Sequence, residues 1–365
     1  MLCSRGLTLS MKDAKLFRAG SRRRLTLIFA CAMVSWLGAS GCTRIYKSNV
    51  TVPPLLAPLK EAEPGQLIAE VNRVAQVQSL RGKIDIQFLD TSFARCGVAE
   101  RYRTAEGDVI LQRDGQIYLV INAPFGIKIA EMTSDGTRFR VAVLQGEEKY
   151  RRFAMGTNNA AYQRLDGGGN IDGDEVDCGE GNKKRSAMMQ QRAASAFSGL
   201  RPQHFTDALL VRPVGAAGAN LIYVRSESFA EDVDTRPGAK PGARVVRGYY
   251  ILDELAPESE GRARLLRRFW FDRFGEVRLA RLQTFGERGE LTTDVVYRNP
   301  KSFGESGNYL LPVDVELTRP QDRYSLRISY QTPEAVKVDQ AWPAEVFKLE
   351  NKWNLPEVDL DAAKK

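Results

Sequence analysis

The stretch KIDIQF, from Lys83 to Phe88, alternates polar and apolar side chains at a period of two. In an extended chain this period places Ile84, Ile86 and Phe88 on one face, so it predicts a strand with one buried and one hydrated face. The same alternation recurs along most of the chain. We predict further strands at 108–112, 138–143, 221–226, 245–252, 264–272, 277–284, 291–298, 310–318 and 324–330.

Tight turns separate these alternating runs. Asp114-Gly115 and Asp135-Gly136 lie between strands of the first half, and Phe274-Gly275 and Arg288-Gly289 lie between strands of the second. Because such pairs readily adopt the positive φ of a short hairpin, neighbouring strands are expected to run antiparallel.

Three helices are predicted between the strands. Residues 66–80 place Leu67 and Val71 on one apolar stripe, and residues 186–197 and 202–210 have helical composition. About a dozen strands against three helices predict a mainly β fold, with one large, curved antiparallel sheet around a few helices. A Gly-rich, acidic stretch at about 157–184 reads as an insertion.

The first 42 residues have the three parts of a secretory signal. A basic cluster at 22–24 precedes thirteen apolar residues at 25–37, which is too short for the roughly 20 residues that span a bilayer. The small residues 38–41 then precede Cys42. The sequence Ala39-Ser40-Gly41-Cys42 resembles a lipoprotein lipobox, which implies a signal peptide at 1–41 and lipidation (palmitate) of Cys42. An ordinary leader with Cys42 as a bystander is the alternative.

Removal of such a leader changes the charge balance. The formal net charge of the whole chain is +8, but the leader holds seven basic residues and one acidic residue, which leaves +2. Nucleic-acid binding needs clustered Lys and Arg in excess, so no nucleic-acid partner is expected. The Pro-containing residues 42–65 are expected to be an extended, lipid-anchored tether.

Two cysteines remain after the leader and the lipidated residue. Cys96 and Cys178 lie in polar, Gly-flanked stretches and would face an oxidising compartment. They are expected to form one disulfide, with two free thiols as the alternative.

Catalytic and metal-binding patterns are sparse. His204 is the one histidine, and no nucleophile elbow or zinc motif accompanies it, so it is read as a surface or first-turn residue of a helix. The acidic stretch 166–177 does not fit a calcium loop and is read as solvated. We expect no enzyme activity, no metal and no cofactor.

Three short motifs resemble one family. Ala123-Pro124-Phe125-Gly126, Leu209-Leu210-Val211-Arg212-Pro213 and the stretch 311–317 are similar to segments of the outer-membrane lipoprotein receptor LolB and its periplasmic relative LolA. The resemblance covers about 66–350, followed by a polar tail at 351–365. It implies an incomplete antiparallel β-barrel of about 11 strands wrapped around a few helices, with a cavity under a helical lid that holds acyl chains. It also makes Phe125 the apolar tip that delivers cargo to the membrane.

The expected function follows from this resemblance and from the leader. Thr43, rather than Asp, follows Cys42, which favours sorting to the outer membrane, facing the periplasm. The protein is expected to bind acyl chains of lipoproteins or lipids, received from a soluble periplasmic carrier, and to pass them to the membrane. A structural or binding envelope lipoprotein without transfer activity is the alternative.

Overall fold

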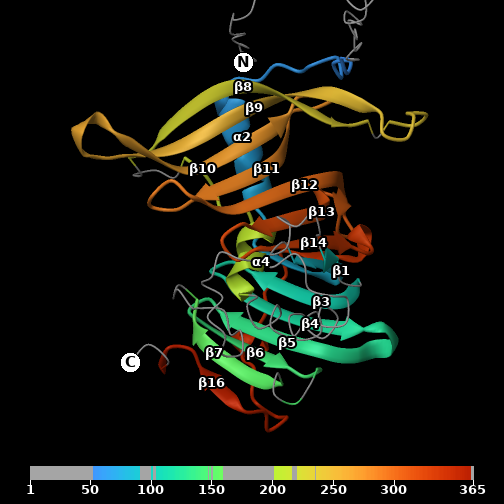
Figure 1. The fold of residues 1–365 in the computed structure, drawn as a ribbon, viewed down its shortest axis with the longest axis vertical. Helices are drawn as coiled ribbons and strands as arrows, with labels where there is room; N and C mark the ends of the chain where they lie inside the picture. The colour runs from blue at the N-terminus through green and yellow to red at the C-terminus, as the bar shows by residue number, and fades with distance from the viewer. Residues whose placement is uncertain are drawn as a thin grey trace, which may run out of the picture. The chain divides into compact units, whose positions relative to one another are not determined.

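The described strands form one sheet whose order runs β16-β7-β6-β5-β4-β3-β1-β14-β13-β12-β11-β10-β9-β8 (Figure 1). The short strands β15 and β2 also pair with β1, which gives sixteen strands. The computed structural model describes residues 52–90, 100–101, 104–146, 148, 151–158, 201–215, 220–234 and 236–362. Among these residues the two end strands, β16 and β8, are not paired with each other, so the sheet is open.

The bounds of the elements are as follows. The two described α-helices are α2 (Pro64–Ala75) and α4 (Pro202–Leu209). The strands of the first half are β1 (Ser79–Asp90), β2 (Glu100–Arg101), β3 (Ala105–Gln112), β4 (Gln116–Ala123), β5 (Ile127–Asp135), β6 (Arg138–Val143) and β7 (Arg152–Thr157). Those of the second half are β8 (Ile222–Val233), β9 (Arg244–Pro257), β10 (Ala263–Asp272), β11 (Arg278–Phe285), β12 (Leu291–Phe303), β13 (Tyr309–Arg319), β14 (Tyr324–Tyr330), β15 (Lys337–Val338) and β16 (Glu357–Asp359).

Nearly every neighbouring pair of strands is antiparallel, and β16 with β7 is the parallel exception. The Asp-Gly turns are confirmed, since Asp114, Gly115 and Gly136 all have positive φ. The mainly β, open antiparallel fold with helices is therefore the one that the alternation predicted. The strand count exceeds about 11 because β2, β15 and β16 carry too few residues to show a period, and because β4, β5 and β7 do not alternate strictly.

Both helices contribute to one apolar core. Leu67 and Val71 of α2 and Phe205 and Ala208 of α4 are buried in the same cluster as inward-facing residues from both halves of the sheet. Figure 1 shows α2 crossing the strands from β8 to β11 and α4 lying near the middle of the sheet. The predicted strand residues Ile84, Ile86 and Phe88 all belong to this core.

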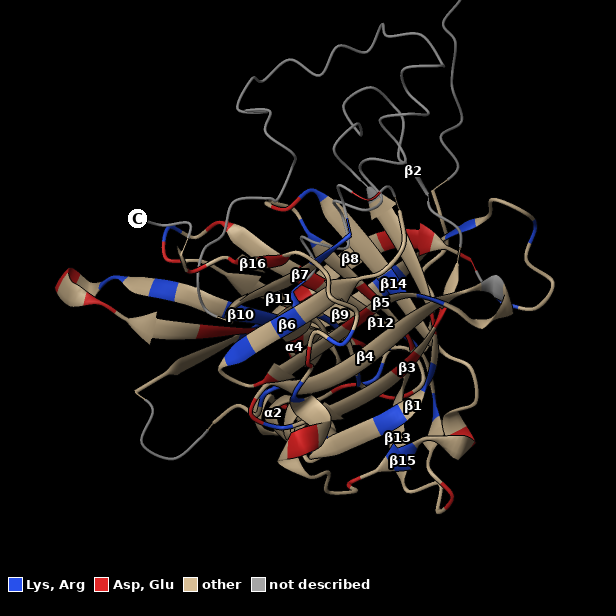
Figure 2. Ribbon diagram, turned by 90° about the horizontal axis from the view of Figure 1, so that it is seen from below, with Lys and Arg blue, Asp and Glu red and all other residues tan. Residues whose placement is uncertain are grey.

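The opposite faces of the strands carry paired charges. Arg268 binds Asp253 at 2.6 Å, and Arg298 binds Glu316 at 2.7 Å, in each case between neighbouring strands. Figure 2 shows basic and acidic residues interspersed along the ribbons. Part of the high content of charged residues thus belongs to cross-strand pairs on a hydrated face.

Helix α2 ends five residues before the predicted end at Leu80. Arg113, in the turn after β3, donates hydrogen bonds to the carbonyl oxygens of Ala75 (2.6 Å) and Val77 (2.9 Å). These bonds satisfy carbonyls that a helix leaves unpaired at its end. Leu80 already belongs to β1, opposite Leu111 of β3, so the longer predicted helix was wrong at its C-terminal end.

The second half of the predicted tether is part of the folded domain. Pro54 and Leu56 exchange backbone hydrogen bonds of 2.9 and 2.8 Å with Val246 of β9, and Leu59 forms a bridge with Phe274. Leu56 and Ala62 are buried. The compact unit accordingly starts at Pro53 rather than near 66.

A buried arginine fixes this segment. Arg273 is 3% exposed, and its guanidinium binds Glu61 (2.5 Å), Glu227 (2.7 Å) and the carbonyl oxygen of Lys60 (3.1 Å). It also stacks 4.2 Å from the ring centre of Tyr250. The Tyr250 hydroxyl donates to Glu61, and this bond, followed by the charge of Arg273, lowers the pKa of the Glu61 carboxyl. We call these groups the Arg273 cluster.

The predicted polar tail also joins the sheet. Glu357–Asp359 forms β16 beside β7, and Leu355 and Leu360 are buried. The boundary predicted at 350 therefore lies inside the folded unit. Most of the Gly-rich insertion and the helix predicted at 186–197 lie outside the described residues.

Candidate functional site

The turn between β4 and β5 carries the most exposed large apolar side chain of the described residues. Phe125 is 100% exposed, and its backbone φ is +69°. Positive φ is rare for a bulky residue and costs on the order of 1–3 kcal/mol. Neither packing nor backbone preference therefore accounts for a phenylalanine at this position.

A buried carboxylate supports the base of the turn. Glu131 of β5 is 3% exposed and accepts hydrogen bonds from Lys128 Nζ (2.5 Å) and from the Tyr118 hydroxyl (3.1 Å). Burial and the neighbouring Glu131 charge raise the pKa of Tyr118 to about 12. This network ties β4 to the first residues of β5, so the turn projects from a fixed base.

An aromatic ring from the C-terminal part of the chain lies beside the turn. Lys128 Nζ is 5.9 Å from the ring centre of Trp353, and Lys352 Nζ is 4.8 Å from it. Trp353 packs against a small buried cluster that includes Leu349 and Leu355. We call Phe125, the half-exposed Ile127, Lys128, Lys352 and Trp353 the tip.

The tip combines three kinds of group that suit a membrane interface. An exposed apolar side chain enters the acyl region, a tryptophan ring prefers the headgroup level, and lysines keep their ammonium groups in water. Such an arrangement requires no nucleophile and no metal. Among the described residues no group of three or more His, Cys, Asp or Glu side chains is placed to hold a metal ion.

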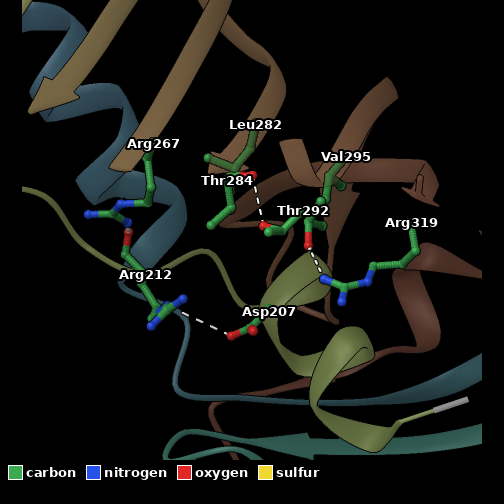
Figure 3. Close-up of a pocket in the computed structure, with 9 residues that line it drawn as sticks. Asp207, Arg212, Arg267, Leu282, Thr284, Thr292, Val295 and Arg319 are labelled. Carbon is green, nitrogen blue, oxygen red and sulfur yellow. Dashed lines mark hydrogen bonds and ion pairs between the residues drawn. The ribbon is translucent and has the colours of Figure 1, made fainter. Parts of the chain in front are cut away.

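A second feature is a polar pocket between α4 and the strands of the second half (Figure 3). Its volume is about 130 Å³. It is lined by Asp207, Arg212, Arg267, Leu282, Thr284, Thr292, Thr293, Val295 and Arg319. Figure 3 shows the guanidinium group of Arg319 (β13) pointing toward the threonines, that of Arg212, in the loop after α4, pointing toward Asp207, and that of Arg267 (β10) pointing toward the backbone of Arg212.

These guanidinium groups already have partners. Arg267 donates to the buried Glu254 (2.8 Å) and, at 3.0 Å each, to the carbonyl oxygens of Arg212 and Pro213. Arg319 binds Asp322 (2.9 Å) and the Thr293 hydroxyl (2.6 Å). The network holds α4 and the loop after it against the sheet.

The pocket is small for a lipid site. Ligand pockets usually enclose about 300–1,000 Å³ and are mostly apolar, whereas this one encloses about 130 Å³ with arginine and threonine at its walls. In this conformation the polar side chains of the pocket therefore cover the edge of the apolar core. An acyl chain would have to take the place of α4 side chains rather than enter this pocket.

The structure corrects one sequence-based interpretation. His204 lies in the first turn of α4, as expected, but it is buried rather than on the surface, with Nδ1 2.5 Å from the Tyr324 hydroxyl. Desolvation lowers its pKa well below 6.5, and the nearby Arg319 acts in the same direction. The side chain is a neutral core residue, since position 204 lies on the buried side of α4 with Phe205 and Ala208.

The other sequence-predicted sites are not brought together. Cys42, Cys96 and Cys178 lie outside the described residues, and so does the acidic stretch 166–177. Sequence reasoning identified Phe125 but missed Trp353, which is more than 200 residues away along the chain. Lys352, which precedes Trp353 in the sequence, gave no local pattern that could have placed that ring near Lys128.

Comparisons with known proteins give fold-level similarities. No protein-family model and no curated protein sequence matches the chain. Among solved structures, the chain is similar to a LolA superfamily protein from Nitrosomonas europaea, with 9% identity, 79% of this chain and 99% of that chain covered, and a TM-score of 0.36. It is similar to a DUF1329 family protein from Desulfovibrio piger at 11% identity, 78% and 95% coverage and a TM-score of 0.34. It is also similar to an outer membrane lipoprotein-sorting protein domain from Vibrio parahaemolyticus at 9% identity, 77% and 94% coverage and a TM-score of 0.34.

Proposed function

We propose that this protein is a lipid-anchored lipoprotein of the outer membrane that binds acyl chains of lipoproteins or lipids and passes them to the membrane. Cys42 carries the lipid in this proposal, and the folded domain faces the periplasm. The protein needs no catalytic group for this task, because transfer depends on apolar surface and shape. No described helix is both long enough and apolar enough to cross a membrane.

The exposure of Phe125 supports the proposal most strongly. A fully exposed phenylalanine with positive φ lowers stability without any contact in return. Insertion of the ring into a lipid interface would regain roughly 1.5–3 kcal/mol, equivalent to about ten- to a hundredfold in membrane affinity. The Trp353 ring and the two lysines beside it are the groups that interfaces favour.

The acyl chains are proposed to lie on the inner face of the sheet beneath α4. This face is apolar, and Phe205 and Ala208 of α4 fill it in the present conformation. Displacement of this eight-residue helix would expose an apolar surface that leads toward β4 and β5. The tip stands at the end of those two strands.

The test compares transfer and stability in the same variants. Phe125→Glu should leave thermal melting unchanged within about 2 °C, since no contact is lost, but it should slow delivery of a bound lipopeptide to liposomes at least tenfold. Phe125→Trp is the matched control and should keep delivery near the original rate. Unchanged delivery by the Glu variant would remove the residue on which the transfer proposal depends.

A specific observation also favours the alternative, a structural or binding envelope lipoprotein without transfer activity. The inner face is packed by helix side chains, and the described pocket beside it is small and polar. If a fluorescent acyl probe does not bind the purified protein at micromolar concentration, this alternative accounts better for the fold.

A further inference from the structure

The end of the sheet at β8 gathers exposed apolar side chains. On this strand Ile222 and Val224 are each 45% exposed, Phe229 is 55% exposed and Val233 is 47% exposed. Two further exposed apolar side chains, Leu55 and Phe274, lie in the segments that extend the sheet next to β9. Among the described strands β8 pairs with β9 alone, and Figure 1 shows it as the outermost strand. Exposed edges of this length and composition are usually covered.

The direction of the outer backbone groups follows from the β8–β9 register. Asp234 N–H donates to Ala243 O at 2.8 Å, so even-numbered residues of β8 face β9. Val246, opposite Glu231, instead bonds to Pro54 and Leu56 on its other side, which agrees with this assignment. The amide and carbonyl groups of the odd-numbered residues from 223 to 233 therefore point away from the sheet.

We infer that β8 pairs antiparallel with β8 of a second copy of this chain, about a twofold axis at Ser228. The six odd-numbered residues are centred on position 228, so this register alone lets all of them form bonded pairs with two hydrogen bonds each. The two sheets would then continue into one another across the pair.

The charges of β8 select the same register. Arg225 of each copy faces Glu231 of the other, which gives two opposite-charge pairs, and no like charges face each other. If the strands slide so that the twofold axis lies at Glu227 instead of Ser228, the two copies of Glu227 face each other. If the axis lies at Phe229, Glu227 of each copy faces Glu231 of the other. Both neighbouring registers are therefore disfavoured by repulsion.

The apolar side chains are matched only in part, since Ile222 and Val224 face Asp234 and Asp232 of the other copy. Tyr223 faces Val233 at both ends of the pair, and Phe229 lies beside Glu227, whose carboxylate is drawn toward Arg273 of its own chain. Charged residues on an edge strand normally prevent pairing with other chains. Here their order permits pairing with an identical strand in one register and opposes the adjacent ones, which argues for a second copy as the occupant.

Cysteine cross-linking of the full-length protein in mild detergent tests the axis. Residues at 228 would form a directly opposed, non-hydrogen-bonded pair with Cβ atoms about 4.5–5.5 Å apart, within reach of a disulfide. Ser228→Cys should therefore give a disulfide-linked dimer on oxidation beyond the level of the parent chain. Ser226→Cys should not link to itself, but it should link to a chain carrying Ala230→Cys.

Charge reversal tests the register independently. Arg225→Glu should weaken dimerisation in analytical ultracentrifugation about ten- to a hundredfold, because it replaces two attractive pairs by two repulsive ones. The double variant Arg225→Glu with Glu231→Arg should restore it. Melting temperatures of each variant separate this effect from loss of the intramolecular bond between Arg225 and the Ala62 carbonyl.

Three outcomes would overturn the inference. A parent protein that stays monomeric up to about 100 µM would show that the edge does not pair with itself, as would be the case if it bound an extended segment of a different protein. Equal cross-linking at 226 and 228 would indicate random collision. A dimer unaffected by the charge variants would use another surface.

Discussion

Mutations in the Arg273 cluster should lower stability by different amounts depending on which charge is removed, because the arginine is buried and the carboxylates are not. The Arg273 side chain is 4% exposed, whereas those of Glu61 and Glu227 are 79% and 45% exposed. Removal of the arginine leaves two carboxylates that water can hydrate. Removal of both carboxylates leaves a buried guanidinium with the Lys60 carbonyl and the Tyr250 ring as its remaining partners.

The magnitudes follow from this difference. An uncompensated buried charge costs about 3–5 kcal/mol, so Glu61→Ala combined with Glu227→Ala should approach that loss. Arg273→Met forfeits hydrogen bonds to largely hydrated carboxylates and retains packing against Tyr250, so about 1–2 kcal/mol is expected. The double variant should therefore be less stable than Arg273→Met by roughly 1–3 kcal/mol.

Urea unfolding followed by tryptophan fluorescence measures both losses, and hydrogen exchange at 54–62 shows whether the N-terminal segment is released. Glu276→Ala, which removes a carboxylate of similar exposure from an ordinary surface pair with Arg278, is the control and should change stability by less than about 0.5 kcal/mol. If Arg273→Met proves as destabilising as the double variant, the burial argument fails.

Four further predictions concern single sites. Phe125→Asn should keep or raise stability by up to about 1 kcal/mol, because Asn tolerates positive φ better; a fall in melting temperature beyond a few degrees contradicts this. The lowered pKa of His204 means that the unfolded chain binds one more proton below pH 6.5, so stability should decrease on acidification by at most about 1.4 kcal/mol per pH unit. His204→Gln should flatten that slope in urea titrations between pH 4 and 6.5, and an unchanged slope would assign it to other groups. Cys42→Ala should abolish palmitate labelling, and persistent label would refute lipidation. Thiol labelling of the denatured, unreduced protein should find neither Cys96 nor Cys178 if they form a disulfide, and full labelling of both would exclude it.

Strand positions were predictable where the alternation was continuous. The strand predicted at 324–330 coincides with β14, because polar and apolar side chains alternate along it and no glycine or proline interrupts them. The strand predicted to end at Arg298 instead continues to Phe303. Asn299, with positive φ, is left out of the β12–β13 register, and Pro300 then pairs opposite Pro312. The register is the same on both sides of Asn299, and Pro300 lies beyond the residues of β12 that pair with β11. A proline at such an edge position does not end a strand, although in the sequence it looks like an end.

The candidate site was predictable only in part. Phe125 was conspicuous because a large apolar residue between proline and glycine has no local reason to occur in a turn. Trp353 was not predictable, since residues 349–355 reach β6 and β7 through tertiary packing that leaves no periodic trace. The same holds for Arg273, which looked like one more charge at the end of a strand. Contacts between distant segments decide the roles of both residues.

The docking of residues 54–62 onto β9 sets how far the domain can travel from its anchor. If Cys42 carries the lipid, ten residues separate it from the first packed residue, Pro53. Fully extended, they span at most about 35 Å, compared with about 80 Å for the whole predicted tether. A tether of this length would keep the edge of the domain at β9 within about 35 Å of the leaflet that holds the anchor. The protein would then stay at one membrane and receive its cargo there, and a mobile partner would have to carry the cargo to it.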